Sequence, residues 1–465
     1  MRLFAVMAAA ALGLGGAAPA AAGHWTNAIE VPGTGALNQG AFQFAEMTSI
    51  SCASGGDCAA GGFYSDRTDH TQAFVASQRN DRWSTAIEVP GTASLNKKNA
   101  AVASVSCGSA GNCAAGGTFE GSHFGTHAFV VTQRDGRWGK AVEIPDPAPA
   151  RAAFAEVTSV SCPPKGGCVA GGDYVIKGVR QPFAVAERDG RWEKAVTLPG
   201  IAKLSVTRFA LLNSMSCSSA GNCIAAGDYA PSQDLGEPYG NQVFTATERN
   251  GRWGDARQIH APASRIAGEA DFSSLSCPSA GNCTLAGSYH NSSGASPAFV
   301  ISERNGRWGK SIAISGIGIE SLSCPTPGNC AASGSISTNP QESQALLVTE
   351  RNGRWGKAFA VPGIAPLDTG DDADATAVSC WSAGNCVAGG TYTNQVSSQA
   401  FVVTDSNGRW GNAFAVPGSE RLNSGRNATI TVLSCTAGGE CGAGGDYAAQ
   451  AGSGQNGEVF VATRT

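Results

Sequence analysis

Short runs of alternating apolar and polar residues, bounded by Gly, Asn, Asp and Pro, follow one another along almost the whole chain. Alternation with a period of two is typical of β-strands with one buried face. One stretch contains runs at 102–107, 113–119, 127–134 and 137–145, and the same order recurs roughly every 55 residues. Four short strands in each repeat predict the blades of a β-propeller and leave no stretch for a second domain.

Side-chain size changes along each repeat. The first two strands are rich in Ser, Ala and Gly, whereas the third carries Phe and the fourth opens with Trp. Blades converge on a central axis, so we predict that the strands with small residues lie innermost. The aromatic strands are then outermost, where neighbouring sheets splay apart and need filling.

The two ends of the chain each carry part of a repeat. The strand at 24–32 matches the fourth strand at 137–145, and the last repeat reaches Thr465 with only its first three strands. We expect these parts to pair as one blade. The prediction is an all-β, eight-bladed β-propeller with four antiparallel strands per blade, closed by the N-terminal strand, which leaves no exposed sheet edge.

The turn between the third and fourth strands is usually Asn-Gly or Asp-Gly, as at Asp135-Gly136, with Asn80-Asp81 as an exception. These pairs favour a type I′ turn, because both central residues need positive φ. In a propeller this turn shares one face with the turn between the first two strands. The loops between the second and third strands vary in length and lie on the opposite face, where binding is expected.

Sixteen cysteines form eight pairs of identical Cys-x5-Cys spacing, each flanking the turn between the first two strands. We predict a disulfide within each pair. Zinc is the alternative, but zinc ligands are usually spaced by two to four residues, with His or Cys partners that this sequence lacks. The predicted pairs are Cys52–Cys58, Cys107–Cys113, Cys162–Cys168, Cys217–Cys223, Cys277–Cys283, Cys324–Cys330, Cys380–Cys386 and Cys435–Cys441.

Residues 1–22 combine Arg2, an apolar Ala-rich run and small residues at Ala20 and Ala22, the pattern of a secretory signal peptide. We expect a signal peptide at 1–22, a single propeller at 23–465 and a secreted, extracellular protein, in which disulfides persist. No other segment suits membrane insertion. The net charge of -4, with dispersed Lys and Arg, argues against a nucleic-acid partner.

Three recurring positions border the variable loops: an aromatic residue that ends the second strand, a polar residue that begins the third, and a polar residue after Leu in the connections between repeats. Aromatic faces beside carboxamides suit a sugar, which offers C–H patches and hydroxyls. Core packing and Asx turns are the structural alternatives. The ligand-binding candidates are Tyr64, Tyr174, Tyr229, Tyr289, Tyr392, Tyr447, Gln72, His127, Gln181, Gln242, Gln344 and Gln399. The connection residues are Asn38, Asn96, Ser205, Asp368 and Asn423.

The sequence has no nucleophile elbow, no His-Glu-x-x-His motif and no phosphate-binding loop. We therefore predict no catalytic residue, no metal and no cofactor; His123 and His127 lack a ligand spacing typical of metal sites. A carbohydrate-active enzyme with an acid/base pair among the loop carboxylates stays an alternative. These carboxylates are Asp66, Asp69, Glu120, Asp234, Glu237 and Glu342.

The repeat Ser-Val-Ser-Cys, Ala-Gly-Asn-Cys-x-Ala-Gly-Gly-x-Tyr and Arg-Asn-Gly-Arg-Trp-Gly resembles the disulfide-stapled propeller repeats of secreted actinomycete proteins, over residues 24–465. It is also similar to lectin-like propeller subunits of umbrella toxin particles. The resemblance implies a secreted propeller with a lectin-like role and a partner protein in an extracellular antibacterial assembly. The function we expect is non-enzymatic recognition of a glycan or cell-surface ligand through the variable loops, with an enzyme or a protein–protein scaffold as alternatives.

Overall fold

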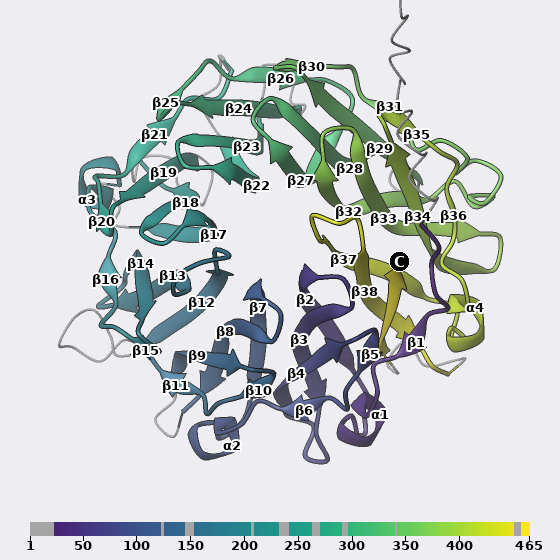
Figure 1. Ribbon diagram of the computed structural model, residues 1–465, viewed down its shortest axis with the longest axis horizontal. Coiled ribbons are helices and arrows are strands. Elements are labelled where there is room, and N and C mark those ends of the chain that lie inside the picture. Colours follow the sequence, from purple (N-terminus) through teal and green to yellow (C-terminus); the bar gives the residue numbers. More distant parts are fainter. Residues whose placement is uncertain are drawn as a thin grey trace, which may run out of the picture.

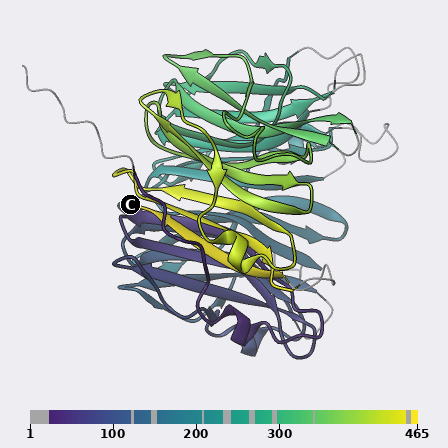
Figure 2. The ribbon, with the colours of Figure 1, turned by 90° about the vertical axis from the view of Figure 1, so that its right-hand side faces the viewer.

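The computed structural model describes residues 23–121, 125–144, 153–205, 209–231, 241–262, 270–290, 296–339, 342–450 and 457–465. The predicted signal peptide lies outside the described residues. Figure 1 shows the sheets arranged as a ring around a central opening, in the order of the sequence. Figure 2 shows the ring from the side, with the strands running across its thickness. This all-β arrangement of four-stranded antiparallel sheets is that of a β-propeller.

Each repeat forms one antiparallel sheet, whose fourth strand is split in two because its middle residues leave the ladder. In the first repeat, β4 pairs with both outer pieces, β5 and β6. We number the repeats as blades 1 to 8 in chain order. Blade 1 contains β2 (Ala45–Ser54), β3 (Asp57–Ser65), β4 (Thr71–Arg79), β5 (Arg82–Trp83) and β6 (Ile87–Glu88). Blade 2 contains β7 (Ala100–Ser109), β8 (Asn112–Glu120), β9 (Thr126–Arg134), β10 (Arg137–Trp138) and β11 (Val142–Glu143). Blade 3 contains β12 (Phe154–Ser161), β13 (Val169–Ile176), β14 (Val179–Arg188), β15 (Arg191–Trp192) and β16 (Val196–Thr197).

The next four blades repeat this order around the ring. Blade 4 contains β17 (Ala210–Ser219), β18 (Asn222–Tyr229), β19 (Gln242–Arg249), β20 (Arg252–Trp253) and β21 (Arg257–Ile259). Blade 5 contains β22 (Ala270–Ser279), β23 (Asn282–Tyr289), β24 (Ala298–Arg304), β25 (Arg307–Trp308) and β26 (Ile312–Ile314). Blade 6 contains β27 (Gly318–Thr326), β28 (Asn329–Asn339), β29 (Glu342–Arg351), β30 (Arg354–Trp355) and β31 (Phe359–Ala360). Blade 7 contains β32 (Ala373–Ser382), β33 (Asn385–Asn394), β34 (Ser397–Ser406), β35 (Arg409–Trp410) and β36 (Phe414–Ala415).

The last sheet joins the two ends of the chain. Its strands β37 (Ala428–Cys435), β38 (Cys441–Ala448) and β39 (Gly457–Arg464) are completed by β1 (Ile29–Glu30), and Ile29 pairs with Val461. The described strands form seven hydrogen-bonded sheets, one of which spans blades 2 and 3 through a single parallel pair. Together with the N-terminal closure, they fit the predicted count of eight blades.

The tight turns of each blade lie together on one face, which we call the disulfide face. The amide of Gly136 in the outer turn of blade 2 donates to the carbonyl of Gly111 in the inner turn, at 2.8 Å. Both residues of the outer turn, Asp135 and Gly136, have positive φ, as the type I′ prediction requires. Asn80 and Asp81 also have positive φ, so this turn has the same conformation as the others although it lacks the glycine.

The core lies between the blades and has the predicted gradient of side-chain size. Each inner hairpin needs glycine: a Cβ at Gly62 would lie 1.9 Å from the carbonyl oxygen of Glu46, beside the bulge in β2. The third strands carry the largest fully buried side chains. These include Phe74, Phe129, Phe183, Phe244, Phe299, Phe401 and Phe460.

All eight predicted disulfides are present, and the described chain has no free cysteine. Each disulfide closes the inner hairpin of one blade. The serine directly before each blade's first cysteine adds a link between blades. In seven of the eight seams, this serine accepts a hydrogen bond from the backbone amide of the next blade's first cysteine. The serines are Ser51, Ser106, Ser161, Ser276, Ser323, Ser379 and Ser434, at 2.9–3.0 Å.

Within the described residues, four one-turn helices occupy connections between blades, where the sequence pattern predicts no regular element. The connection residues Asn38, Asn96, Ser205 and Asn423 lie at their C-terminal caps, and the Asn38 amide nitrogen donates to the Thr34 carbonyl. The polar side chains of these residues bond to neighbouring strands: Asn38 Oδ1 accepts the amide of Ser65, and Asn423 Nδ2 donates to the carbonyl of Ser398. The helices are α1 (Thr34–Leu37), α2 (Thr92–Leu95), α3 (Ile201–Leu204) and α4 (Ser419–Leu422).

Candidate ligand-binding face

The loops between the second and third strands lie on the face opposite the disulfides, which we call the loop face. In blade 1, Tyr64 at the end of β3 pairs with Gln72 at the start of β4, whereas Cys52 pairs with Cys58 at the other end of the sheet. The entry to each first strand lies on the loop face too, since Ala45 pairs with Tyr64. Parts of several variable loops, at 122–124, 232–240, 291–295, 340–341 and 451–456, lie outside the described residues.

The six candidate tyrosines are buried. Their exposed fractions lie between 2% and 8%, so their rings pack in the core and offer no open face to a sugar in this conformation. The hydroxyl of Tyr174 donates to Gln181, and that of Tyr447 donates to Glu30. Burial raises the pKa of Tyr229 to about 12. These contacts favour the packing role, and the binding role of the tyrosines stays a prediction.

The glutamines at the start of the third strands mostly bond to their neighbours. Gln72 donates to Asp66 (2.7 Å) and accepts from Asn96 (2.8 Å). Gln242 and Gln399 are buried, and Gln344 is exposed. Among these candidates, Gln344 is thus the one whose carboxamide is open to a ligand.

His127 is half-buried in blade 2. Its ring stacks on Phe119 with 5.2 Å between centroids, and its Nδ1 lies 3.2 Å from Glu143 Oε1. His123, the other histidine of this loop, lies outside the described residues. Across the described chain, no three His, Cys, Asp or Glu side chains are grouped so that they could hold a metal.

Three phenylalanines on the loop face are absent from the predicted candidates. Phe44, Phe154 and Phe209 each stand eight residues before the first cysteine of their repeat, where other repeats carry polar residues such as Asn99 and Asn427. Phe44 is 43% exposed and Phe209 37%, and Phe154 is half-buried. Alignment of the repeats on their cysteines would have found them.

Two of these rings flank a charged group at the seam between blades 3 and 4. The Arg180 guanidinium lies 5.1 Å from the centroid of Phe154 and 6.0 Å from that of Phe209. Its Nε donates to Asp173 and its Nη2 to Glu156 Oε1, the latter at 2.5 Å. Burial raises the pKa of the Asp173 carboxyl in spite of Arg180. The arrangement holds the guanidinium and both rings in place, with the Arg180 side chain 26% exposed.

Asp228 and Asp446 each stand directly before the tyrosine near the end of a second strand, and each connects its blade to the next. Asp228 accepts the amide of Phe272 at 2.8 Å, and Asp446 accepts that of Met47 at 2.9 Å. Burial raises the pKa of both carboxyls to about 7. The charge of Glu46 also raises the pKa of Asp446.

The loop carboxylates act mainly within their own loops. Burial opposes ionisation of Asp66, but hydrogen bonds from Thr68, Gln72 and His70 outweigh it and hold its pKa below the usual range. Asp69 accepts the amide of Ala41 at 2.6 Å. Glu120 accepts from Asn99 (2.9 Å), Glu342 is exposed, and Asp234 and Glu237 lie outside the described residues.

Comparison with known proteins supports the fold only. No family model matches the sequence, and neither does any curated protein. Among solved structures, Sqt1 from Chaetomium thermophilum has a TM-score of 0.51 at 10% identity, over 94% of this chain and 99% of that one. The β-propeller domain of the Trilobed protease from Pyrococcus furiosus has a TM-score of 0.44 at 8% identity, over 81% and 99%.

A polysaccharide lyase, an ulvan lyase, has a TM-score of 0.41 at 10% identity, over 84% of this chain and 94% of that one. Likenesses this distant carry no argument about function. They do not support the resemblance to actinomycete repeats or to umbrella toxin subunits, which stays a prediction. None of the helices in the described chain is both long and apolar enough to cross a membrane.

Proposed function

We propose that this protein is a secreted, eight-bladed recognition propeller that binds a glycan or cell-envelope ligand on its loop face, without catalysing a reaction. The observation that carries the proposal is that phenylalanines stand at the entries to the first strands of blades 1, 3 and 4, of which Phe44 and Phe209 are more than one-third exposed. Phe42, two residues before Phe44 in the sequence, is 57% exposed.

Exposed aromatic rings on a rigid frame suit a sugar, whose C–H patches stack on the ring while its hydroxyls bond to polar neighbours. The frame is rigid because disulfides, turn-to-turn bonds and seam serines restrain the opposite face. Polar side chains such as Asn99 and Gln344 border the same loops. A partner protein that joins this propeller to a larger extracellular assembly would leave the loop face free for the ligand.

The test is a glycan and cell-wall binding screen with the mature protein, residues 23–465. We expect the double variant Phe44→Ala/Phe209→Ala to bind its best glycan about tenfold more weakly, because the stacking surface is lost. The matched control is Phe359→Ala/Phe414→Ala, which removes two rings of 36% and 41% exposure from the outer rim. Equal losses in both variants would contradict the proposal. Binding to no glycan, with a protein partner recovered from culture supernatant, would favour the scaffold.

One observation favours an enzyme as the second candidate. Asp446, with its pKa raised to about 7, lies beside Glu46 at the seam between blades 8 and 1, and both are only partly buried. A neutral carboxyl beside an ionised one is the acid/base pair that glycosidases use. Turnover of fluorogenic glycosides, lost in Asp446→Asn, would put the enzyme first. No turnover across a broad glycoside panel would exclude this pair from catalysis.

A further inference from the structure

The seam between blades 4 and 5 differs from the other seven. The amide of Cys277 does not donate to Ser216, although every other seam of the described ring has this serine-to-cysteine bond. The neighbouring bond is also missing: Leu322 donates to Ser274 at the next seam (3.2 Å), but Leu275 has no such contact with Ser214. The step between the first cysteines of these blades is 60 residues, the longest in the chain. These two blades are still joined by the bond from the Phe272 amide to Asp228, but they lack both serine bonds.

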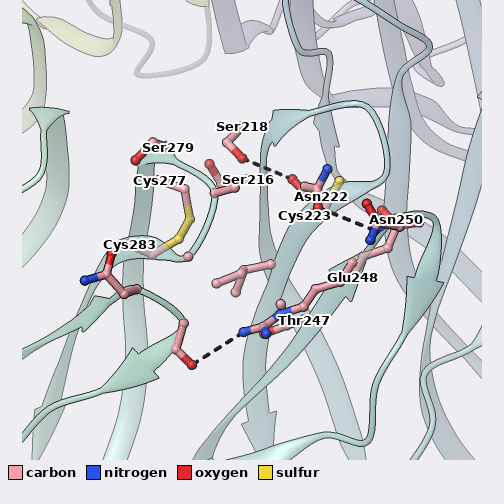
Figure 3. A pocket seen from close by; sticks show the side chains of 16 residues that line it. Ser216, Ser218, Asn222, Cys223, Thr247, Glu248, Asn250, Cys277, Ser279 and Cys283 are labelled. Atoms are coloured by element: carbon pink, nitrogen blue, oxygen red, sulfur yellow. Dashed lines mark hydrogen bonds between the residues drawn. A yellow bond between two sulfur atoms is a disulfide. The ribbon is translucent and has the colours of Figure 1, made fainter.

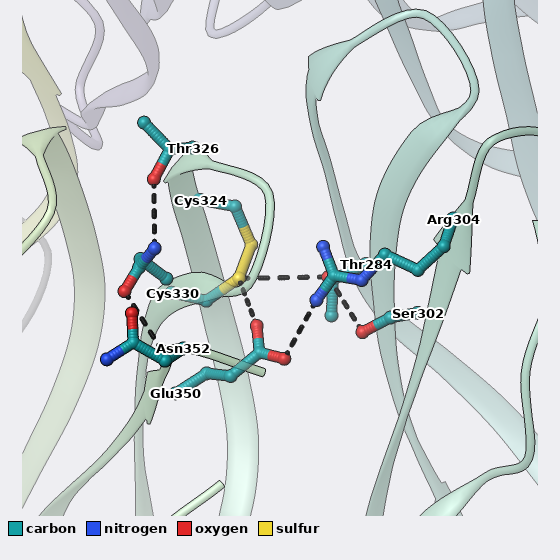
Figure 4. A network of polar contacts seen from close by, with 9 residues as sticks. Thr284, Ser302, Arg304, Cys324, Thr326, Cys330, Glu350 and Asn352 are labelled. Atoms are coloured by element: carbon teal, nitrogen blue, oxygen red, sulfur yellow. Dashed lines mark hydrogen bonds and ion pairs between the residues drawn. A yellow bond between two sulfur atoms is a disulfide. The ribbon is translucent and has the colours of Figure 1, made fainter. Parts of the chain in front are cut away.

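The arginine that ends the third strand of blade 4 makes no ion pair with the acidic residue of the next blade, in contrast to Arg134 and Arg304 at two other seams. In the next seam, Arg304 Nη2 lies 3.1 Å from Glu350 Oε1, and Figure 4 shows this pair beside the disulfide of Cys330. The corresponding Arg249 makes no ion pair with Glu303 and donates to the carbonyl of Gly306 at 3.4 Å. Glu303 is 1% exposed, and its Oε2 has no hydrogen-bond partner in the described chain.

Two pockets flank Arg249 at this seam. The inner pocket, of about 250 Å³, lies among the disulfide-face turns of the two blades and is drawn in Figure 3. The outer pocket, of about 450 Å³, lies between the outer strands of blade 4 and Trp308 of blade 5. Thr247, Arg249 and Gly306 line both.

The outer pocket is rich in positive charge although the protein is acidic. Arg249, Arg252, Arg257 and Arg307 line it. The acidic side chains on its lining are Glu303 and Asp255, and Asp255 is already paired with Lys203 at 2.6 Å. Arg257 is specific to this blade, because the same position of the fourth strand is apolar in the other seven. Those residues are Ile29, Ile87, Val142, Val196, Ile312, Phe359 and Phe414.

The pocket also has groups that suit a sugar ring. Trp308 lines one wall, and its indole N–H has no protein acceptor within the described residues, as is also the case for Trp83, Trp355 and Trp410. Its volume fits one or two sugar units. A guanidinium binds a carboxylate through two parallel hydrogen bonds, and an indole face stacks on C–H groups.

We propose that this outer pocket binds a saccharide that carries a carboxylate, as a second site separate from the loop face. The carboxylate lies among Arg249, Arg252 and Arg257, and the ring lies against Trp308.

The test is calorimetric titration of the mature protein with glucuronate, glucose and acetate. We expect glucuronate to bind at least about tenfold more tightly than glucose or acetate, because glucose lacks the carboxylate and acetate lacks the sugar ring. Arg257→Ile, the residue that other blades carry, should weaken glucuronate binding about tenfold and keep the fold. A second variant, Arg252→Gln, should have the same direction of effect.

Ile312→Arg is the matched control, since it adds the same charge to blade 5, where Arg304 is already paired; it should not create a second binding event. Acetate that binds as tightly as glucuronate would indicate a site for an acidic peptide and overturn the sugar assignment. No glucuronate binding at 10 mM ligand, roughly the weakest affinity worth a site, would overturn the proposal itself. Phe44→Ala should leave glucuronate binding unchanged, so failure of the loop-face proposal and failure of this one can be told apart.

Discussion

Single carboxyl groups buried between blades respond to pH in this molecule. Asp228 is 6% exposed and uses one oxygen to accept the amide of Phe272, so the ionised form has lost most of its hydration. Its pKa in the folded protein is about 7, against 3.8 for an ordinary aspartate. A raised folded-state pKa means that the unfolded chain gives up this proton first as the pH rises.

The resulting stability change has a definite sign. Below pH 4 Asp228 is protonated in both the folded and the unfolded state, and its contribution to the free energy of unfolding is fully present. Between about pH 4 and pH 7 this contribution falls by up to about 1.4 kcal/mol per pH unit. We expect Asp228→Asn, which keeps the acceptor for Phe272, to flatten this part of the profile and to be more stable than the wild type at pH 8. Urea unfolding of the variant and the wild type at pH 4, 6 and 8 measures the free energy of unfolding that tests this expectation.

Asp81→Asn is the control for the loss of one charge, because Asp81 is exposed in a turn with positive φ that asparagine also adopts. A parallel profile for Asp228→Asn and the wild type would show that this carboxyl is ionised in the fold.

At the scale of the secondary structure, each inner hairpin has few large side chains and is held by its disulfide. Gly-Gly and Ala residues fill the second strands, so packing alone contributes less there than in the third strands, where Phe401 and its equivalents are fully buried. The disulfide restrains the unfolded chain at the place where the folded chain gains least from burial.

We expect the double variant Cys380→Ala/Cys386→Ala to lose about 2 kcal/mol of unfolding free energy, the chain-entropy value for a loop of about seven residues. Blade 7 should keep its sheet, because the ladders of β33 with β32 and β34 do not depend on the bond. Denaturant unfolding with and without dithiothreitol separates the effects: the difference from the wild type should vanish once all disulfides are reduced. A variant as stable as the wild type under oxidising conditions would contradict the expectation.

At the scale of the whole molecule, closure of the ring depends on the first described residues. Trp25 is 3% exposed and Val31 is fully buried, and β1 covers the edge of β39. Without this segment, β39 would present unpaired backbone groups to solvent, which is a template for association.

We therefore expect a chain that begins at residue 33 to unfold at lower denaturant concentration and to elute as oligomers in size-exclusion chromatography. A synthetic peptide of residues 23–32 should restore the monomer. Ile29→Lys is the control, since Ile29 is 45% exposed and its backbone pairing does not need the side chain. A monomeric, equally stable truncated chain would show that the clasp is dispensable.

The sequence alone determined the strands, the disulfides and the orientation of the blades. The strand predicted at 113–119 is observed as β8 at Asn112–Glu120, and the clasp pairs as expected, because period-two patterns and turn residues act locally and recur in every repeat. The four short helices were missed because a single turn has no periodicity to read. The fourth strand, predicted as one run at 137–145, is split into β10 and β11 where its middle residues leave the ladder.

Only the tertiary structure decided which side chains are available to a ligand. The tyrosines end the second strands as the repeat predicts, yet neighbouring blades cover them, and the phenylalanines at the entries to the first strands are the exposed rings instead. The arginine pocket likewise depends on one seam that lacks its serine bonds. Burial and pairing across a seam arise between residues some 55 positions apart, so no local pattern in the sequence could show them.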